Sequence, residues 1–240
     1  MSDFAFDISA QPDPTTCGPT CLQAVYRYYD DDVDLATVIA EAQSLDGGGT
    51  LGALLGVHAL KRGYRATLYT YNLEVFDPSW FRLPRPEMVR RMEHRIEVKP
   101  DRPRLRTATL AYLEFMRLGG VLRSVDVSPR LIRRLLEDER PVLTGLSATW
   151  LYDEPREIGA TNTPDDIHGE PAGHFVVLTG FDDRSYKVSV ADPLQPNALA
   201  LNGLYKVSVS RLITAALLGV LTYDANFLQV WPDSREKRRS

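Results

Sequence analysis

The sequence predicts an α+β fold in which N-terminal helices pack on an antiparallel β-sheet formed by the second half of the chain. Apolar residues recur at helical spacing in the first sixty positions. Later segments are short, rich in β-branched residues and bounded by turn residues. No internal repeat or low-complexity linker divides the 240 residues. We therefore expect one domain over residues 1–232, followed by a disordered basic tail, residues 233–240.

The first predicted helix covers residues 18–29, where Pro19 suits a first helical turn. Two short helices, 35–42 and 51–61, and a strand over 65–71 follow. Residues 74–120 are predicted to form a mostly helical insertion. Four prolines interrupt the helical pattern there and divide it into shorter pieces. The remaining predicted elements are a helix over 128–137, a buried strand from 141, strands over 174–181 and 186–192, a helix over 210–218 and a strand over 227–230.

Composition and charge exclude several classes of protein. The net charge of −4 argues against a general nucleic-acid binder, which needs an excess of Lys and Arg to neutralise phosphates. The first residues lack the pattern of a secretory signal, and no apolar run is long enough to span a membrane. We therefore expect a cytoplasmic protein without membrane contacts. Two cysteines four positions apart cannot form a disulfide framework, so chemistry or packing must explain them.

Cys17 is the candidate nucleophile, because it directly precedes the first predicted helix. Free amides and the positive end of the dipole at a helix N-terminus favour a thiolate there. The N–H of Cys17 also points to where an oxyanion would form, and the side chain of Gln11 could supply a second donor. Cys21 lies one turn further along, on a side shared with apolar residues, and we assign it a packing role.

His174 and Asp192 are the candidate base and its orienting carboxylate. Residues 174–192 are predicted to form a hairpin, and a turn centred on Asp183 would place His174 directly opposite Asp192. Val176, Leu178, Val188 and Val190 would share that face. Asp192 would then accept the Nδ1 proton of His174, leaving Nε2 to exchange a proton with the thiol.

Other histidines fit this chemistry less well. His168 is the competing base, but its loop offers no orienting partner, whereas His58 and His94 fall in helical segments and are interpreted as surface or packing residues. A metal site made of Cys17, Cys21, His168 and His174 is a further alternative. Three residues between the cysteines is a poor spacing for zinc, so we expect no metal and no cofactor.

The segments QPDPTTCGPTCLQAVYRYY, DERPVLTGL, GHFVVLTGFD and YKVSVADP together resemble the C39-like branch of the papain-like cysteine peptidases. The resemblance spans most of the chain and implies a papain-like fold with a catalytic Cys on the first helix. It also implies a His and an Asp on neighbouring strands of the later sheet, and an oxyanion-hole Gln before the Cys. These roles fall on Cys17, His174, Asp192 and Gln11.

The chain departs from this family in two respects. Founding members are exporter domains that cut leader peptides after a double glycine, whereas this chain has neither a membrane span nor a phosphate-binding P-loop. The insertion over 74–120 is the second departure and would help to shape the cleft. Segments such as ALKRGY and GEPAGHF look similar to free-standing relatives found near ATP-grasp peptide ligases, which suggests a functional link to such a ligase.

The expected function is therefore a cysteine peptidase or amidohydrolase that cleaves a peptide or isopeptide bond through a thioester. An acyl or peptidyl transferase with the same three residues, and a non-catalytic peptide-binding module, are the alternatives. The stretch 82–106 is strongly basic, and if it borders the cleft the substrate would be an acidic, poly-glutamate-like peptide.

Overall fold

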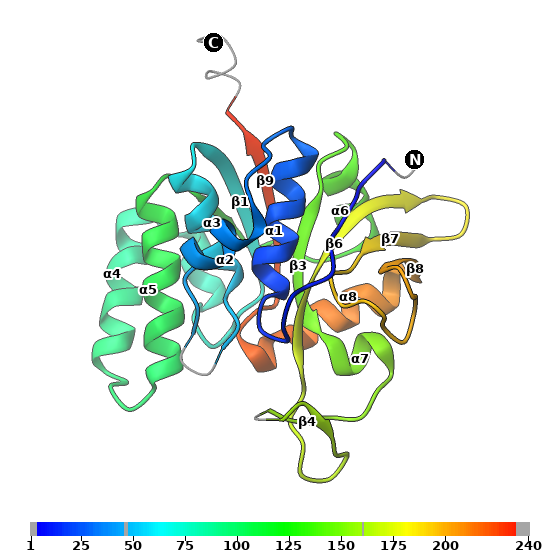
Figure 1. Ribbon diagram of the computed structural model, residues 1–240. Coiled ribbons are helices and arrows are strands. Elements are labelled where there is room, and N and C mark those ends of the chain that lie inside the picture. The colour runs from blue at the N-terminus through cyan, green and yellow to red at the C-terminus, as the bar shows by residue number, and fades with distance from the viewer. Residues whose placement is uncertain (1–3, 46–47, 160, 234–240) are drawn as a thin grey trace.

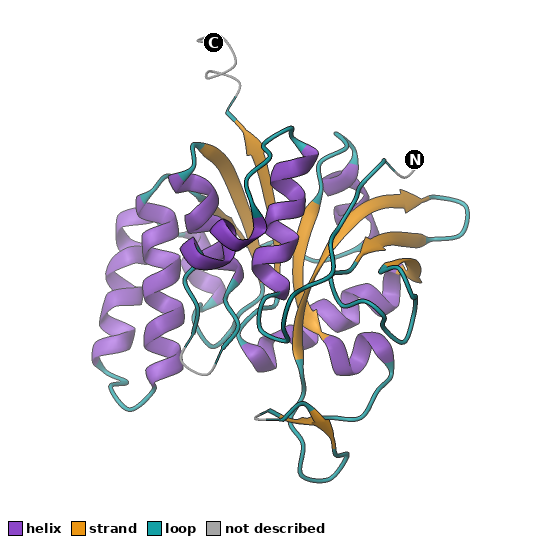
Figure 2. Ribbon diagram, viewed as in Figure 1, coloured by secondary structure: helices purple, strands orange, loops and turns teal. Residues whose placement is uncertain are grey.

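The computed structural model describes residues 4–45, 48–159 and 161–233, and is organised around a seven-stranded sheet (Figures 1 and 2). The strand order is β2-β1-β9-β3-β6-β7-β8, and every neighbouring pair is antiparallel except β1 with β2. A two-stranded ribbon, β4 with β5, stands apart from it. The strands are β1 (Tyr64–Thr70), β2 (Val121–Arg123), β3 (Val142–Ser147), β4 (Glu157–Ile158), β5 (Thr163–Pro164), β6 (Gly173–Asp182), β7 (Lys187–Ala191), β8 (Leu204–Ser208) and β9 (Asn226–Pro232).

The N-terminal helices cover one face of the sheet, with α1 in front of β6 and β3 and the pair α4 and α5 at the edge of the molecule (Figure 1). Ten consecutive residues of α1, Cys17 to Tyr26, are buried, so this helix is enclosed by the fold on all sides of its first two turns. The elements of this face are α1 (Cys17–Tyr28), α2 (Leu35–Glu41), α3 (Gly52–Lys61), η1 (Pro78–Arg82), α4 (Arg85–Glu97) and α5 (Pro103–Arg117).

The opposite face is covered by helices from the second half of the chain. Ser128 and Ser208 cap α6 and α8, because each hydroxyl accepts a backbone N–H of the first helical turn. α8 packs on β3, and α6 packs on β6. The elements of this face are α6 (Pro129–Leu136), α7 (Ala148–Tyr152), α8 (Val209–Leu218) and η2 (Gly219–Thr222).

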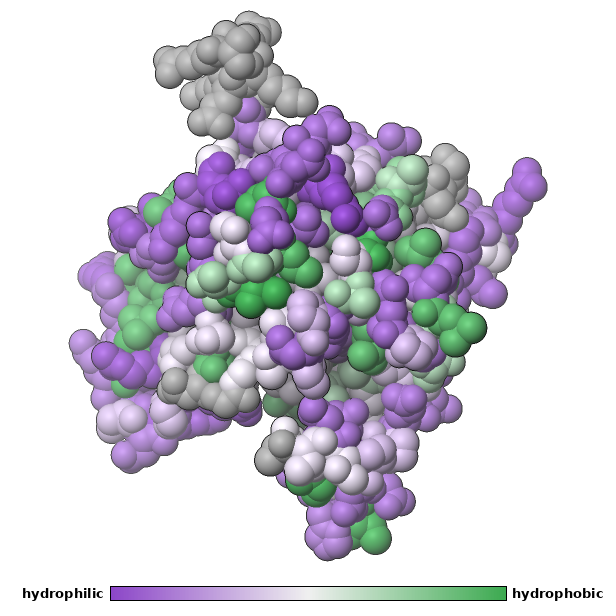
Figure 3. Space-filling model, viewed as in Figure 1, coloured by the Kyte–Doolittle hydropathy of each residue, from purple (hydrophilic) through white to green (hydrophobic). Residues whose placement is uncertain are grey.

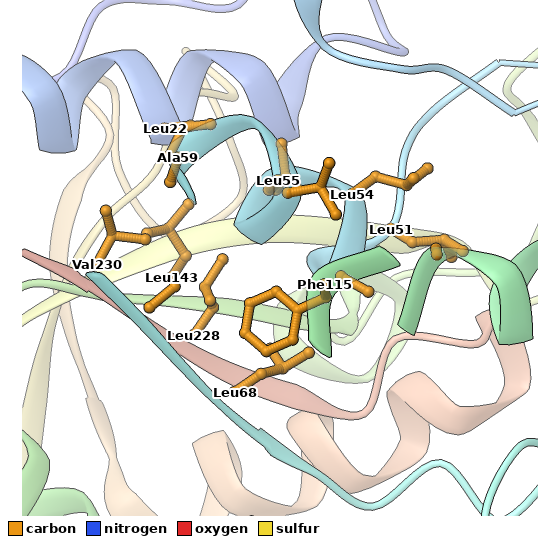
Figure 4. Packing of buried hydrophobic residues seen from close by; sticks show 14 of the residues in the cluster. Leu22, Leu51, Leu54, Leu55, Ala59, Leu68, Phe115, Leu143, Leu228 and Val230 are labelled. Atoms are coloured by element: carbon orange, nitrogen blue, oxygen red, sulfur yellow. The ribbon is translucent and has the colours of Figure 1, made fainter. Parts of the chain in front are cut away.

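Each face of the sheet has its own hydrophobic core. The first contains α1, α3, α4 and α5, and Figure 4 shows Phe115 of α5 against Leu68 of β1 and Leu228 of β9. Phe115 fits tightly, because a Cβ added at Gly56 or Gly120 would lie 2.5 Å from its ring. Residues 74–120 therefore contribute to this core rather than forming a separate body. The second core joins α6, α7 and α8 to β3, β6 and β7.

The predicted α+β class is confirmed, and the predicted helices and strands lie within a few residues of the observed ones. Four features were missed: β2, α7, the β4–β5 ribbon and β8. All are short, and short elements in turn-rich sequence leave little periodic signal. Most of the predicted tail, residues 234–240, lies outside the described residues.

Candidate active site

Cys17 is the first residue of α1, and its side chain is only 7% exposed. Thr16 provides no side-chain cap, so the amides of the first turn are not occupied by a capping hydroxyl. Gly18 brings this helix start close to the loop that precedes α3, since a Cβ at Gly18 would lie 2.6 Å from Cγ2 of Thr50. The thiol therefore lies where free amides meet the wall of a cleft.

His174 lies at the start of β6, where it hydrogen-bonds Asp192 and lines the same cavity as Cys17. Its Nε2 is 2.8 Å from Oδ1 of Asp192, and Cys17 is close enough to raise the pKa of the imidazole. Because Nε2 is occupied by Asp192, Nδ1 is the nitrogen left to face Cys17. The structure thus places Cys17 beside the hydrogen-bonded pair of His174 and Asp192. The expected use of the two nitrogens was wrong: Nε2, not Nδ1, faces the carboxylate.

The predicted hairpin register was also wrong, although the two side chains meet. The turn is wider than expected, so Asp182 pairs with Lys187 rather than with residue 184, a shift of three. An irregularity at Thr179 shifts the pairing back by one, and Leu178 pairs with Val190 rather than with Val188. The net displacement is two residues. An even displacement keeps each side chain on its predicted face, and His174 therefore reaches Asp192 diagonally.

Asp192 is fully buried and accepts four hydrogen bonds. Oδ1 accepts a hydrogen bond from His174 Nε2 at 2.8 Å and one from the backbone N–H of Leu194 at 2.9 Å. Oδ2 accepts hydrogen bonds from the hydroxyls of Tyr152 at 2.7 Å and Tyr205 at 2.6 Å. Both carboxylate oxygens are thereby saturated and the orientation of the carboxylate is fixed.

Charge and hydrogen bonding outweigh burial at this pair. Burial raises the pKa of Asp192, but the charge and hydrogen bond of His174 and the two tyrosine hydroxyls hold that pKa below its ordinary value. Burial lowers the pKa of His174, but the charge and hydrogen bond of Asp192, followed by Cys17, raise it above its ordinary value. Burial and the charge of Asp192 raise the pKa of both tyrosines, so their hydroxyls remain donors.

Gln11 lies on the loop that leads into α1, beside the same pair. Its backbone N–H donates to the carbonyl of Pro193 at 2.8 Å, which ties this loop to the residue after Asp192. Its side-chain Nε2 donates to the carbonyl of Asp13 at 2.9 Å, and Oε1 is buried without a partner among the described residues. An amide nitrogen has two hydrogens, so one remains for another acceptor.

Two cavities meet at His174. One, of about 490 Å³, is lined by Gln11 and by the segment around α7. The other, of about 740 Å³, is lined by Cys17 and by residues 48–50. The chain around β4 and β5 borders both cavities, and Figure 3 shows the lobe that carries this ribbon projecting from the body, with the surface hollowed beside it. A chain bound along the cleft would pass the thiol.

The remaining candidates lie elsewhere. Cys21 is 0% exposed and its thiol donates to the carbonyl of Phe175 at 3.3 Å, while burial raises its pKa well above the ordinary value. His168 is exposed, and the expectation that its loop offers no orienting partner was wrong, because its Nδ1 lies 3.1 Å from Oδ2 of Asp165. His58 is buried against Tyr26, and His94 lies on the exposed side of α4 near Glu97. Within the described ranges, no three His, Cys, Asp or Glu side chains are grouped as metal ligands would be.

Sequence reasoning missed Tyr152 and Tyr205, the two donors to Asp192. They come from α7 and β8, two of the elements that were not predicted. The only available signal was the alternation in LYKVS before α8. Asp224, which lines the cavity that holds Cys17, was missed as well.

Three solved structures are similar to this chain, and the first of those described below supports the fold. A putative C39-like peptidase from Bacillus anthracis aligns over 95% of this chain and 96% of its own, with a TM-score of 0.52 and 14% identity. The peptidase domain of Streptococcus ComA, a bifunctional ABC transporter involved in quorum sensing, aligns over 95% and 100%, with a TM-score of 0.44 and 12% identity. A double glycine motif protease from an AMS/PCAT transporter, in complex with the leader peptide, aligns over 96% and 94%, with a TM-score of 0.47 and 14% identity.

No curated protein matches the chain. Among the described residues, no helix combines the length and the apolar character needed to cross a membrane. The model of the Peptidase_C39 like family matches residues 122–209, a segment that contains His174 and Asp192, while Cys17 and Gln11 precede it. The chain is therefore similar to the Peptidase_C39 like family over residues 122–209, and it shares its fold with the Bacillus anthracis protein.

Proposed function

We propose that this chain is a cysteine peptidase or amidohydrolase in which Cys17 is the nucleophile, His174 the general base and acid, and Asp192 the orienting carboxylate. The observation that carries the proposal is the buried hydrogen-bonded pair of His174 and Asp192 beside Cys17, at the meeting point of two cavities. Residues 1–232 would form the peptidase domain, with the helical segment 74–120 as part of it.

The reaction would proceed through a thioester. Nδ1 of His174 takes the proton of the Cys17 thiol, and Sγ attacks the substrate carbonyl carbon. The N–H of Cys17 and the free amide hydrogen of Gln11 would stabilise the oxyanion. His174 then gives the proton to the leaving nitrogen, and the C–N bond breaks. Water, deprotonated by His174, attacks the thioester and releases the carboxylic acid and the thiol.

An acidic peptide is the substrate that charge favours. Within the basic stretch 82–106, Arg90 and Arg91 pair with Glu87 and Arg102 pairs with Glu74. Arg104, however, lines the cavity that holds Cys17, as does Arg156. A peptide carrying carboxylates would therefore meet positive charge at this cavity. Poly-glutamate-like chains made by an ATP-grasp ligase are one such substrate.

Transfer of the acyl group to an amine is the second candidate, because the thioester would react with whichever nucleophile the cleft admits. A module that only binds peptides would keep the cleft but would have no use for the ordered Cys17–His174–Asp192 series. The peptidase and the transferase differ only after the thioester has formed.

The test is to trap that thioester. Wild type and Cys17→Ser are mixed with p-nitrophenyl acetate and with a short γ- or α-linked glutamate peptide, and intact mass is followed with time. We expect a hydroxylamine-labile adduct on Cys17 in the wild type alone, which water removes. Faster loss of the adduct in glycinamide, with an amide product, would favour the transferase. Absence of any adduct from the wild type would contradict both enzymatic readings.

A further inference from the structure

Asp224 occupies a buried position in the cavity that holds Cys17. It lies between η2 and β9 and is 6% exposed. Its position is set by close packing, because a Cβ at Gly145 of β3 would lie 2.7 Å from the Asp224 carbonyl oxygen and 2.8 Å from its Cβ. The same cavity is lined by Thr50 and Thr222. A carboxyl group is thus held at the protein wall of the cleft.

Only one of the two carboxyl oxygens is used by the fold. Oδ1 accepts the N–H of Gly52, the first residue of α3, at 2.8 Å, and Nδ2 of Asn226 at 3.0 Å. Within the described residues, no donor reaches Oδ2. Capping α3 explains why an oxygen is needed here, but an Asn side chain would supply that oxygen equally well. The negative charge and the second oxygen therefore lack a structural explanation.

Among the residues that the structure describes, no cationic side chain forms an ion pair with this carboxyl group. Burial raises the pKa of Asp224 to about 7, and the hydrogen bonds from Gly52 and Asn226 only partly oppose that effect. No cationic side chain contributes to the shift. Tyr112, whose hydroxyl bonds to Asn226, stays neutral because burial raises its pKa. The other titratable or charged groups around the cavity are Cys17, Arg104, Arg156, Glu170 and His174.

We propose that Asp224 binds an alkylammonium group of the substrate and so determines which chains are presented to Cys17. The ammonium would donate to Oδ2 and supply the counter-charge that this carboxylate lacks. A free peptide N-terminus and a Lys side chain both carry this group. The inference deepens the proposed function, and it is compatible with an acidic chain, whose N-terminus would lie at Asp224 while its carboxylates face Arg104 and Arg156.

The experiment measures the alkylation of Cys17 by matched probes. N-(ω-aminoalkyl)iodoacetamides with two, four or six methylenes are compared with N-alkyl iodoacetamides of equal length. Rate constants are measured for the wild type, Asp224→Asn and Asp101→Asn, an exposed carboxylate on the α4–α5 loop. The ratio of cationic to neutral rate is taken within each variant, so that differences in thiol reactivity cancel.

In the wild type at pH 8, we expect the cationic probe of one length to alkylate Cys17 about tenfold faster than the neutral probe of equal length. A preference of this size is typical of a partly buried pair of opposite charges. The ratio should fall towards one as pH drops through about 7, because Asp224 is then protonated. Asp224→Asn should abolish the preference, and Asp101→Asn should retain it. Dipeptide and Lys-containing p-nitroanilides, each with and without N-acetylation, then separate the two sources of the ammonium.

A ratio of one in the wild type at every length, or a preference that survives in Asp224→Asn, would overturn the role of Asp224. If Asp224→Asn does not fold, the pH dependence of the wild-type ratio decides alone, and a ratio constant from pH 5.5 to 8.5 contradicts the inference. Failure of plain iodoacetamide to alkylate Cys17 would instead contradict the proposed function.

Discussion

The two cysteines of this chain lie one helical turn apart, yet their surroundings differ in every respect that controls reactivity. Cys17 begins α1, lies close enough to His174 to raise its pKa, and lines a cavity of about 740 Å³. Cys21 is completely buried in the first core and donates to the carbonyl of Phe175. Burial raises the pKa of Cys21, and the neighbouring charges of Cys17 and Asp192 raise it further.

The difference shows that helix position alone does not make a thiol a nucleophile. Cys17 faces a cleft and a base, whereas Cys21, four residues later in α1, contacts a backbone carbonyl and apolar neighbours. A thiolate at Cys21 would lose the hydrogen bond that it donates and would be surrounded by groups that cannot stabilise an anion. The cysteine at the helix start is the one for which the fold provides a proton acceptor.

The largest effect is expected from Cys17→Ser. The serine hydroxyl fits the space but is not deprotonated by His174, so thioester formation and peptide turnover should fall by at least about 10³-fold. Cys21→Ser is the matched control and should keep turnover within about twofold. Equal losses in the two variants, measured by the acyl-adduct assay, would remove the distinction between the cysteines.

Asp192→Asn should have the next largest effect, because it removes the charge that keeps His174 protonated. The pKa of His174 then falls, so the imidazolium needed to protonate the leaving nitrogen is lost at a lower pH. Turnover should drop by about 10²–10⁴-fold, and the alkaline limb of its pH profile should move to lower pH. A reduced rate with an unmoved alkaline limb would mean that Asp192 does not act through His174.

Tyr205→Phe should have a smaller effect at the same carboxylate. It leaves Oδ2 with the Tyr152 hydroxyl alone, and one of the hydrogen bonds that lower the pKa of Asp192 is lost. Asp192 is then protonated at a higher pH, so the acid limb of the turnover profile should move up and the rate at pH 7 should fall by about tenfold. Lys206→Gln, next to it in β8, is a suitable control and should leave both limbs in place.

The smallest effect on activity, but a measurable effect on stability, is expected from Cys21→Ser. The hydroxyl can keep the hydrogen bond to Phe175, but it is more polar than the thiol and is buried in an apolar core. The free energy of unfolding should fall by about 1–2 kcal/mol in urea titrations. A loss of turnover without a loss of stability would give Cys21 a chemical role that this account denies it.

Sequence reasoning predicted which residues lie together better than it predicted their geometry. Cys17 could be identified because a helix start is visible in local spacing and Pro19. The common face of His174 and Asp192 followed from the two-residue period of strands, which an even shift in register preserves. The register itself depends on turn width and on the irregularity at Thr179, and neither has a clear local signal.

Side chains that arrive from distant, short elements could not be predicted. Tyr152 and Tyr205 converge on Asp192 from α7 and β8, and Asp224 reaches the cleft from the turn before β9. Their roles follow from tertiary packing, because nothing in LYKVS or in the residues around Asp224 indicates what lies opposite them. A contact of this kind is visible only once the sheet order is known.

The most direct test of the central claim is the rate at which each cysteine reacts with iodoacetamide, followed by intact mass and peptide mapping at pH 7. We predict that Cys17 is alkylated at least about a hundredfold faster than Cys21, and that His174→Ala slows Cys17 without changing Cys21. Equal rates at the two cysteines, or a Cys17 rate indifferent to the loss of His174, would contradict the assignment of Cys17 as the nucleophile.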